Sequence, residues 1–237
     1  MGRGREKEVK LNFLLYFHMQ KLEENSIKQF DFWARFHQIF SIPFYFLSKE
    51  IAKIVNPTKG TSVLDIGCGW GLLLMELHNL SRGLKLYGID ISPNMVHVAK
   101  LKLAKIDDVE ILEGSADNLP YKDNSFQYVT CILSFHHHPD SLRSLREMYR
   151  ILKPNGKVFL LDPFKSGLIA KIMMVVNNIV FQEKDIRVYT KEGIQKLFEE
   201  AGFVNIQQRV RNTYHLLTIG EKARRSKLVA SKEEELL

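Results

Sequence analysis

A short apolar run that leads directly into a cluster of glycines constrains the fold of this chain more than any other feature. Residues 63–72 read Val-Leu-Asp-Ile-Gly-Cys-Gly-Trp-Gly-Leu. The first four residues suit a buried strand, and residues 72–80 after the glycines have the apolar spacing of a helix. Glycines between a strand and a helix let backbone N–H groups approach a ligand, because no Cβ lies in the way. The sequence therefore predicts a ligand cradle at this turn.

The order of the glycines does not fit a dinucleotide-binding loop. Such loops read Gly-x-Gly-x-x-Gly or Ala, with a small third residue for close packing of helix on strand. Gly67 and Gly69 match the first two positions, but Leu72 occupies the third and Gly71 comes one residue early. Asp65 precedes the loop, where a carboxylate would repel a pyrophosphate but suit a cationic or amine-bearing ligand.

Composition indicates one globular domain of ordinary character. The chain has 237 residues, 45% hydrophobic and 26% charged, which is enough for a substantial core. The net charge of +7 could favour nucleic acid or an anionic membrane, but no basic run is interleaved with aromatic residues, so we interpret it as a solvated surface. Only two cysteines, Cys68 and Cys131, fit a reducing compartment without a disulfide framework or zinc site. With no secretory signal or bilayer-spanning run, we expect a cytoplasmic monomer or homodimer.

The chain divides into three predicted parts. Residues 1–55 predict an aromatic-rich helical lid segment in which Pro43 separates two helices. Residues 56–222 form the ligand-binding domain, within which 165–185 predict a helical insertion or lid, and residues 223–237 form a charged tail.

Within the central part, strands and helices alternate. We expect strands at 62–66, 84–89, 109–112, 127–133, 156–162, 203–210 and 214–220, and helices near 71–80, 93–105, 140–152 and 190–201. This alternation predicts an α/β fold with a doubly wound, mostly parallel, seven-stranded Rossmann-like sheet. The last two strands have a short link, so one C-terminal strand should be antiparallel.

Polar residues follow the predicted strands at the edge where ligands bind in such sheets. Asp90 ends the second strand, and its carboxylate can accept two hydrogen bonds from a ribose diol. After the third strand, Asp117 could accept from an exocyclic amine and Ala116 N–H could donate to a purine nitrogen. Three histidines, residues 136–138, follow the fourth strand. Together these features predict a nucleoside site without a phosphate anchor.

Four segments in this order resemble the class I S-adenosylmethionine-dependent methyltransferases. They are residues 63–71, 88–95, 114–120 with 124–126, and 152–157. The resemblance implies S-adenosylmethionine as cofactor and S-adenosylhomocysteine as product, with Asp65 and the glycine loop at the methionyl end, Asp90 at the ribose and Asp117 at the adenine amine. The implied cofactor-binding residues are Asp65, Gly67, Cys68, Gly69, Gly71, Asp90, Ile91, Met95, Ala116, Asp117, Asn118 and Leu133.

Within that family, the chain most resembles the small-molecule group (methyltransferase type 11), which includes quinone-ring, sterol and phospholipid-headgroup methyltransferases. Residues 135–140, Phe-His-His-His-Pro-Asp, resemble a motif common in that group. Residues 30–37 resemble the N-terminal lid segment of the quinone-biosynthesis branch, which implies substrate or lid contacts for Trp33, Phe36 and His37. That branch usually has Tyr-Asp where this chain has Phe36-His37.

The predicted reaction is in-line displacement at the sulfonium methyl by a small, hydrophobic or amphiphilic acceptor. A hydroxyl or activated-carbon acceptor calls for His136 or His137 as general base, whereas a neutral amine needs little base catalysis. The histidines could equally orient substrate or cap the next helix, and we expect no metal role. Peripheral contact with a membrane stays open. So do two other classes of protein: an RNA or protein methyltransferase, and a non-catalytic protein that binds a nucleoside cofactor.

Overall fold

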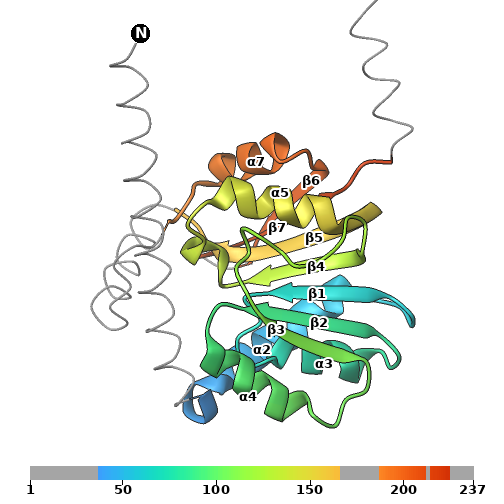
Figure 1. Cartoon of the computed structure of the whole chain (residues 1–237). Helices are drawn as coiled ribbons and strands as arrows, with labels where there is room; N and C mark the ends of the chain where they lie inside the picture. The colour runs from blue at the N-terminus through green and yellow to red at the C-terminus, as the bar shows by residue number, and fades with distance from the viewer. Residues whose placement is uncertain (1–36, 166–186, 212–213, 225–237) are drawn as a thin grey trace, which may run out of the picture.

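Seven strands form one sheet in the order β3-β2-β1-β4-β5-β7-β6, with helices on both faces (Figure 1). The structure is a computed structural model that describes residues 37–165, 187–211 and 214–224. The strands are β1 (Ser62–Ile66), β2 (Lys85–Asp90), β3 (Val109–Glu113), β4 (Phe126–Ile132), β5 (Leu152–Pro163), β6 (Val204–Val210) and β7 (His215–Glu221). The helices are α2 (His37–Val55), α3 (Leu72–Leu80), α4 (Pro93–Leu103), α5 (Ser141–Ile151), α7 (Lys191–Glu200) and the 3-10 turn η1 (Phe135–His137).

The pairing of the strands confirms the predicted fold class. Strands β1 to β5 pair in parallel, while β7 runs antiparallel to both β5 and β6. Ile66 of β1 lies opposite Ile89 of β2 and Cys131 of β4, so these three strands end level with one another. The residues that follow them therefore meet at one edge of the sheet.

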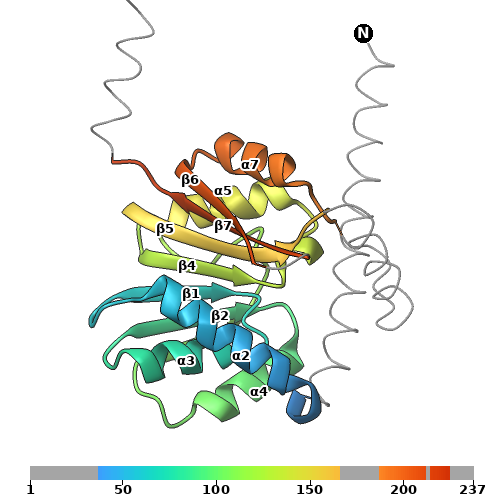
Figure 2. The same cartoon turned by 180° about the vertical axis from the view of Figure 1, so that it is seen from behind.

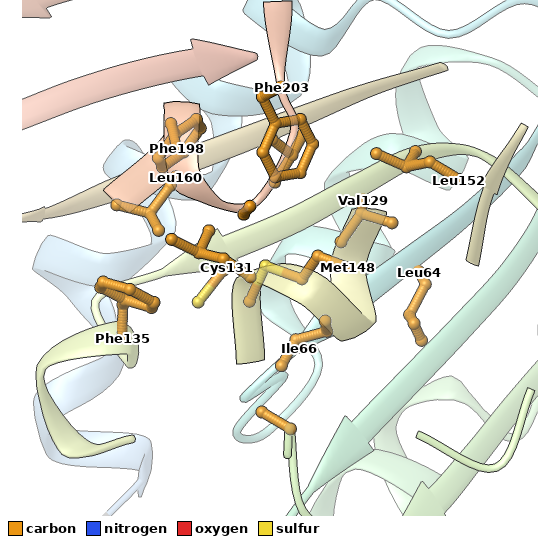
Figure 3. Close-up of a cluster of buried hydrophobic side chains, with 14 of the residues drawn as sticks. Leu64, Ile66, Val129, Cys131, Phe135, Met148, Leu152, Leu160, Phe198 and Phe203 are labelled. Carbon is orange, nitrogen blue, oxygen red and sulfur yellow. The ribbon is translucent and has the colours of Figure 1, made fainter. Parts of the chain in front are cut away.

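Each face of the sheet carries its own apolar cluster. Helices α2, α3 and α4 cover one face, and α5 and α7 cover the other (Figures 1 and 2). Alternate strand residues point to opposite faces, so that Val63 joins the first cluster while Leu64 and Ile66 join the second. Figure 3 shows Phe198 of α7 and Met148 of α5 in the second cluster. Strands buried on both faces read as continuous apolar runs, which is the pattern of β1 in the sequence.

The prediction that Pro43 separates two helices is wrong. Helix α2 runs from His37 to Val55 without a break at that position. Proline removes one backbone hydrogen bond and crowds the preceding turn. The helix continues because its second half is fixed by packing: Ile51, Ala52 and Val55 are buried in the core. Tertiary burial outweighs the local preference here.

The structure describes the three predicted parts of the chain to different extents. Residues 1–36 of the expected lid segment, 166–186 of the expected insertion and 225–237 of the expected tail lie outside the described residues. The boundaries at 55 and 222 stay predictions. Among the helices that the structure describes, none combines the length and the apolar character needed to cross a membrane.

A substitution in the second cluster tests the core. The side chain of Phe198 is fully buried, so Phe198→Ala should lower the free energy of unfolding by about 3–5 kcal/mol. Leu101 is 66% exposed, and Leu101→Ala should change it by less than about 0.5 kcal/mol. Urea denaturation of both variants measures the difference, and equal effects would contradict the packing.

Candidate functional site

The carboxylate of Asp90 joins the two loops that follow β1 and β2. Its Oδ2 accepts a hydrogen bond from Gly69 N at 2.8 Å, and its Oδ1 accepts one from Ser92 N at 3.0 Å. Ser92 caps α4 by accepting from Met95 N at 3.2 Å, so Asp90 itself is not the cap. Asp90 is only 7% exposed. A carboxylate has about four acceptor positions, so the two amide bonds by themselves do not fill it.

The glycines of the loop serve two different purposes. A Cβ on Gly67 would lie 2.4 Å from Ser134 Cβ, and one on Gly71 would lie 2.8 Å from Leu103 Cδ1. These two glycines therefore let the loop pack against the β4 loop and against α4. A Cβ on Gly69 would meet no atom within 4 Å. The early glycine at position 71 is thus explained by helix packing, while position 69 borders open space that suits a ligand.

Asp65 is a buried carboxyl group beside the same loop. It is 3% exposed and accepts a hydrogen bond from Thr130 Oγ1 at 2.7 Å. Burial raises its pKa from 3.8 to about 7, against the opposing effect of the Thr130 bond and with a further increase from the charge of Asp90. Two acids in one low-dielectric region favour a cationic partner, because a positive charge restores the ionised form. The ammonium group of an amino acid has this charge.

Asp117 lies against the start of α5 rather than in an isolated turn. The Ser144 hydroxyl hydrogen-bonds to its Oδ1, and Arg143 Nε donates to its backbone carbonyl at 2.9 Å. Burial raises the pKa of Asp117, while the Ser144 bond acts in the opposite direction. Neighbouring Ala116 is buried and Asn118 is exposed.

A pair of charged residues on α5, not anticipated from the sequence, holds the loop beyond Asp117. Arg150 donates from Nη1 to Tyr121 O at 2.7 Å and from Nη2 to Leu119 O at 3.1 Å. Glu147 Oε2 accepts from Leu119 N at 2.9 Å, and the Arg150 bond lowers the pKa of Glu147. Glu147 and Arg150 are three residues apart on one helix, and this spacing is the sequence signal from which the pair could have been predicted.

The apolar residues of the predicted site lie at the same edge. Met95 is buried and Ile91 is half-buried, both close in sequence to Asp90. Leu133 follows β4 with a φ of 54°, a left-handed conformation that is rare for a branched side chain. Its N–H donates to Leu161 O at 2.8 Å, which holds the strand end in this conformation. Such strain is often found at functional sites.

His136 makes a buried hydrogen bond with Asp162 that was not predicted from the sequence. Its Nδ1 lies 2.8 Å from Asp162 Oδ1, and both side chains are buried. Asp162 ends the strand predicted at 156–162, so inspecting the end of the fifth strand would have found it.

The other histidines near this pair stay neutral at pH 7. Burial lowers the pKa of His137 well below 6.5, and the same effect lowers that of His138 to about 3. Burial also lowers the pKa of His215 at the start of β7, although Asp162 acts to raise it. The rings of His136 and His137 lie 4.1 Å apart between centroids.

Three predicted residues cannot be placed. Trp33 and Phe36 lie outside the described residues, and of His37 only its position at the start of α2 is described. Within the described ranges, no group of three or more His, Cys, Asp or Glu side chains could hold a metal ion. Cys68 and Cys131 are free and buried.

A cavity of about 210 Å³ lies away from this edge, with Val55, Tyr128, Lys157 and Arg209 among its lining residues. Tyr128 stands near the amino end of β4, with Lys157 opposite it on β5, whereas Asp65 and Asp90 stand at carboxyl ends of strands and His136 follows the carboxyl end of β4. The cavity is therefore separate from the cradle.

Comparison with known proteins decides the family. The family described as "Methyltransferase domain" matches residues 64–160. A demethylmenaquinone methyltransferase of Staphylococcus aureus is 35% identical over 181 residues, which cover 68% of this chain and 75% of the relative. The chain belongs to the S-adenosylmethionine-dependent methyltransferases.

Solved structures show the same fold for this methyltransferase. The Haloferax volcanii putative methyltransferase, solved in complex with the Trm112 methyltransferase activator, has a TM-score of 0.72 at 23% identity, covering 84% of this chain and 97% of that one. Phosphoethanolamine N-methyltransferase 2 of Haemonchus contortus, solved with S-adenosyl-L-methionine, has a TM-score of 0.64 at 20% identity, covering 75% and 52%. The open space at Gly69 and the buried acids Asp65 and Asp90 fit this cofactor.

The raised pKa of Asp65 predicts a pH dependence of stability. Between pH 4 and pH 7 the folded protein binds the Asp65 proton while the unfolded chain has released it, so this group makes stability fall as pH rises. Asp65→Asn should remove that part of the slope, which denaturant unfolding across this pH range measures. Asp108→Asn, at an exposed position, is the control. If stability depends on pH in Asp65→Asn as it does in the unmodified chain, the raised pKa of Asp65 is contradicted.

Proposed function

We propose that this methyltransferase methylates a small, hydrophobic or amphiphilic acceptor at the carboxyl edge of its sheet. The bridge from Asp90 to Gly69 carries the proposal, because it joins two strand ends into one cradle beside the buried acid Asp65. When bound, S-adenosylmethionine supplies a methyl group on a positively charged sulfur that is already a good leaving group. The protein therefore needs to position the acceptor against the methyl group, exclude water from the reacting groups and, where the acceptor requires it, take up a proton.

In this proposal the two acids of the cradle hold opposite parts of the cofactor. Asp65 faces its ammonium group, and Asp90 accepts from the ribose hydroxyls while still holding the glycine loop. Asp117 with Ala116 and Asn118 lies at the adenine edge, which the bonds of Arg150 and Glu147 to the following loop keep in place. The remaining proposed contacts are Gly67, Cys68, Gly71, Ile91, Met95 and Leu133.

Two observations support an acceptor with an apolar ring. The Staphylococcus aureus relative acts on demethylmenaquinone by its name, and a quinone-type ring is the acceptor class that this suggests. In addition, Phe44 and Phe46 of α2 are exposed, and Phe44 packs edge-to-face on Trp70 of the glycine loop at 5.8 Å. Aromatic surface beside the cradle suits an amphiphilic molecule. Peripheral membrane contact stays a prediction.

We assign the general base to His136. It follows β4 and lies at the same edge as Asp65, and its side chain is buried and bonded to Asp162. His137, the other residue that the sequence offers, has a strongly lowered pKa and is therefore a weaker base at neutral pH.

Binding measurements test the cofactor site. Titration calorimetry of the full chain should show binding of S-adenosylmethionine and S-adenosylhomocysteine but not of NAD. Asp90→Ala should weaken binding of both by at least about 100-fold, because a buried charged acceptor is lost. Asp107→Ala, at an exposed position, is the control, and circular dichroism checks that both variants fold. Undiminished affinity in folded Asp90→Ala would overturn the ribose role.

An acceptor screen tests the remaining part of the proposal. Release of S-adenosylhomocysteine should be measured with quinols, amines, phospholipids and RNA as acceptors. We expect turnover with quinols. Turnover with RNA alone would overturn the small-molecule assignment, and cofactor binding without turnover on any acceptor would favour a binding protein.

A further inference from the structure

We propose that Asp162 is a positioning residue that makes His136 the base for an acceptor with an ionisable ring hydroxyl. The inference rests on the proposed methyl transfer and goes beyond it in two respects. It assigns a role to an acid on a strand that the cofactor site does not use, and it names the group on the acceptor that must lose a proton.

Two elements fix the position of His136. Its Nδ1 is held at 2.8 Å by Asp162 Oδ1, which lies near the end of β5 opposite Leu216 of β7. Its backbone carbonyl accepts from Arg187 N at 3.0 Å. The imidazole is therefore anchored through both its ring and its backbone, which is the geometry that a base needs in order to be pre-organised.

The pairing determines which nitrogen is basic. An ionised carboxylate can only accept a hydrogen bond, so Nδ1 carries the hydrogen and Nε2 is the nitrogen that takes up a proton. The negative charge of Asp162 then stabilises the imidazolium that forms. The same arrangement of base and orienting acid recurs in unrelated catalytic sites.

The groups around the pair do not oppose this role. The titratable residues that contact or act on His136 include His137 and His138 on its own turn, Asp162 on β5, His215 on β7 and Arg187, whose backbone N–H bonds to the His136 carbonyl. The three histidines are neutral at pH 7, because burial lowers each pKa. Asp162 is the acid in direct contact with the His136 ring.

The proton balance points to a hydroxyl group on the acceptor. A neutral amine attacks without first losing a proton, so a buried dyad would add little. A ring hydroxyl instead gives its proton to Nε2, while the new bond to the methyl carbon forms at the oxygen or at the adjacent ring carbon. The carbon–sulfur bond breaks and leaves its electron pair on sulfur. For a ring carbon, the C–H proton then leaves to solvent, the ring becomes aromatic again, and His136 returns its proton to the oxygen.

The test uses Asp162→Asn and His136→Gln in the full chain, with Asp108→Asn as the control. We expect Asp162→Asn to lower kcat about 10–100-fold with quinol, with the affinity for S-adenosylhomocysteine unchanged. The acidic limb of its pH–rate profile should move to lower pH, because the imidazolium loses its stabilising charge. His136→Gln should lose the limb altogether.

A measurement independent of turnover follows the histidine itself. In 15N NMR spectra of histidine-labelled protein, His136 should carry its hydrogen on Nδ1 and titrate at higher pH than in Asp162→Asn. If the pH–rate profile and the His136 titration are the same in Asp162→Asn as in the unmodified chain, the pairing of Asp162 with His136 has no role in the reaction. Methyl transfer itself would still stand. Methylation of amines alone would overturn the hydroxyl acceptor. Failure of the unmodified chain to bind S-adenosylhomocysteine would instead overturn the proposed function itself.

Discussion

The carboxylate of Asp90 is the interaction on which the site depends. It accepts from Gly69 N and from Ser92 N, and so ties the loop after β1 to the start of α4. It adds to the backbone bonds by which Gly67 N and Cys68 N both donate to Ile89 O, and so further restrains a loop whose three glycines restrict the backbone little. Together these bonds hold the turn, and its open side lies at Gly69. The other parts of the proposed site are arranged around this turn.

The two apolar clusters make that arrangement rigid. Because β1, β2 and β4 end level and are buried on both faces, their carboxyl ends present Asp65, Asp90 and the turn with His136 at one edge. Burying acids is costly, and the raised pKa of Asp65 expresses that cost. A cationic cofactor bound beside Asp65 would offset this cost, because its positive charge favours the ionised carboxylate. In the proposed site, Asp65 serves the cofactor and the His136–Asp162 pair serves proton transfer.

Much of this could be predicted from the sequence because it is encoded locally. Alternating strands and helices predicted the sheet, and the acid at the end of the second strand predicted Asp90. Features that depend on distant contacts were missed. Pro43 lies inside a helix because Ile51 and Val55 are buried against the sheet, which no local preference reveals. Asp162 meets His136 only because β5 pairs with β4, and the contacts of Arg150 with residues 119–121 depend on how α5 packs.

A crystal structure of the full chain with S-adenosylhomocysteine would show directly whether Asp90 binds the ribose. We expect ribose hydroxyls within hydrogen-bonding distance of the Asp90 carboxylate, with the bond from Gly69 N to Asp90 retained and the ammonium group beside Asp65. A ligand in the cavity lined by Val55, Tyr128 and Arg209, or a ribose without any contact to Asp90, would overturn the role of Asp90.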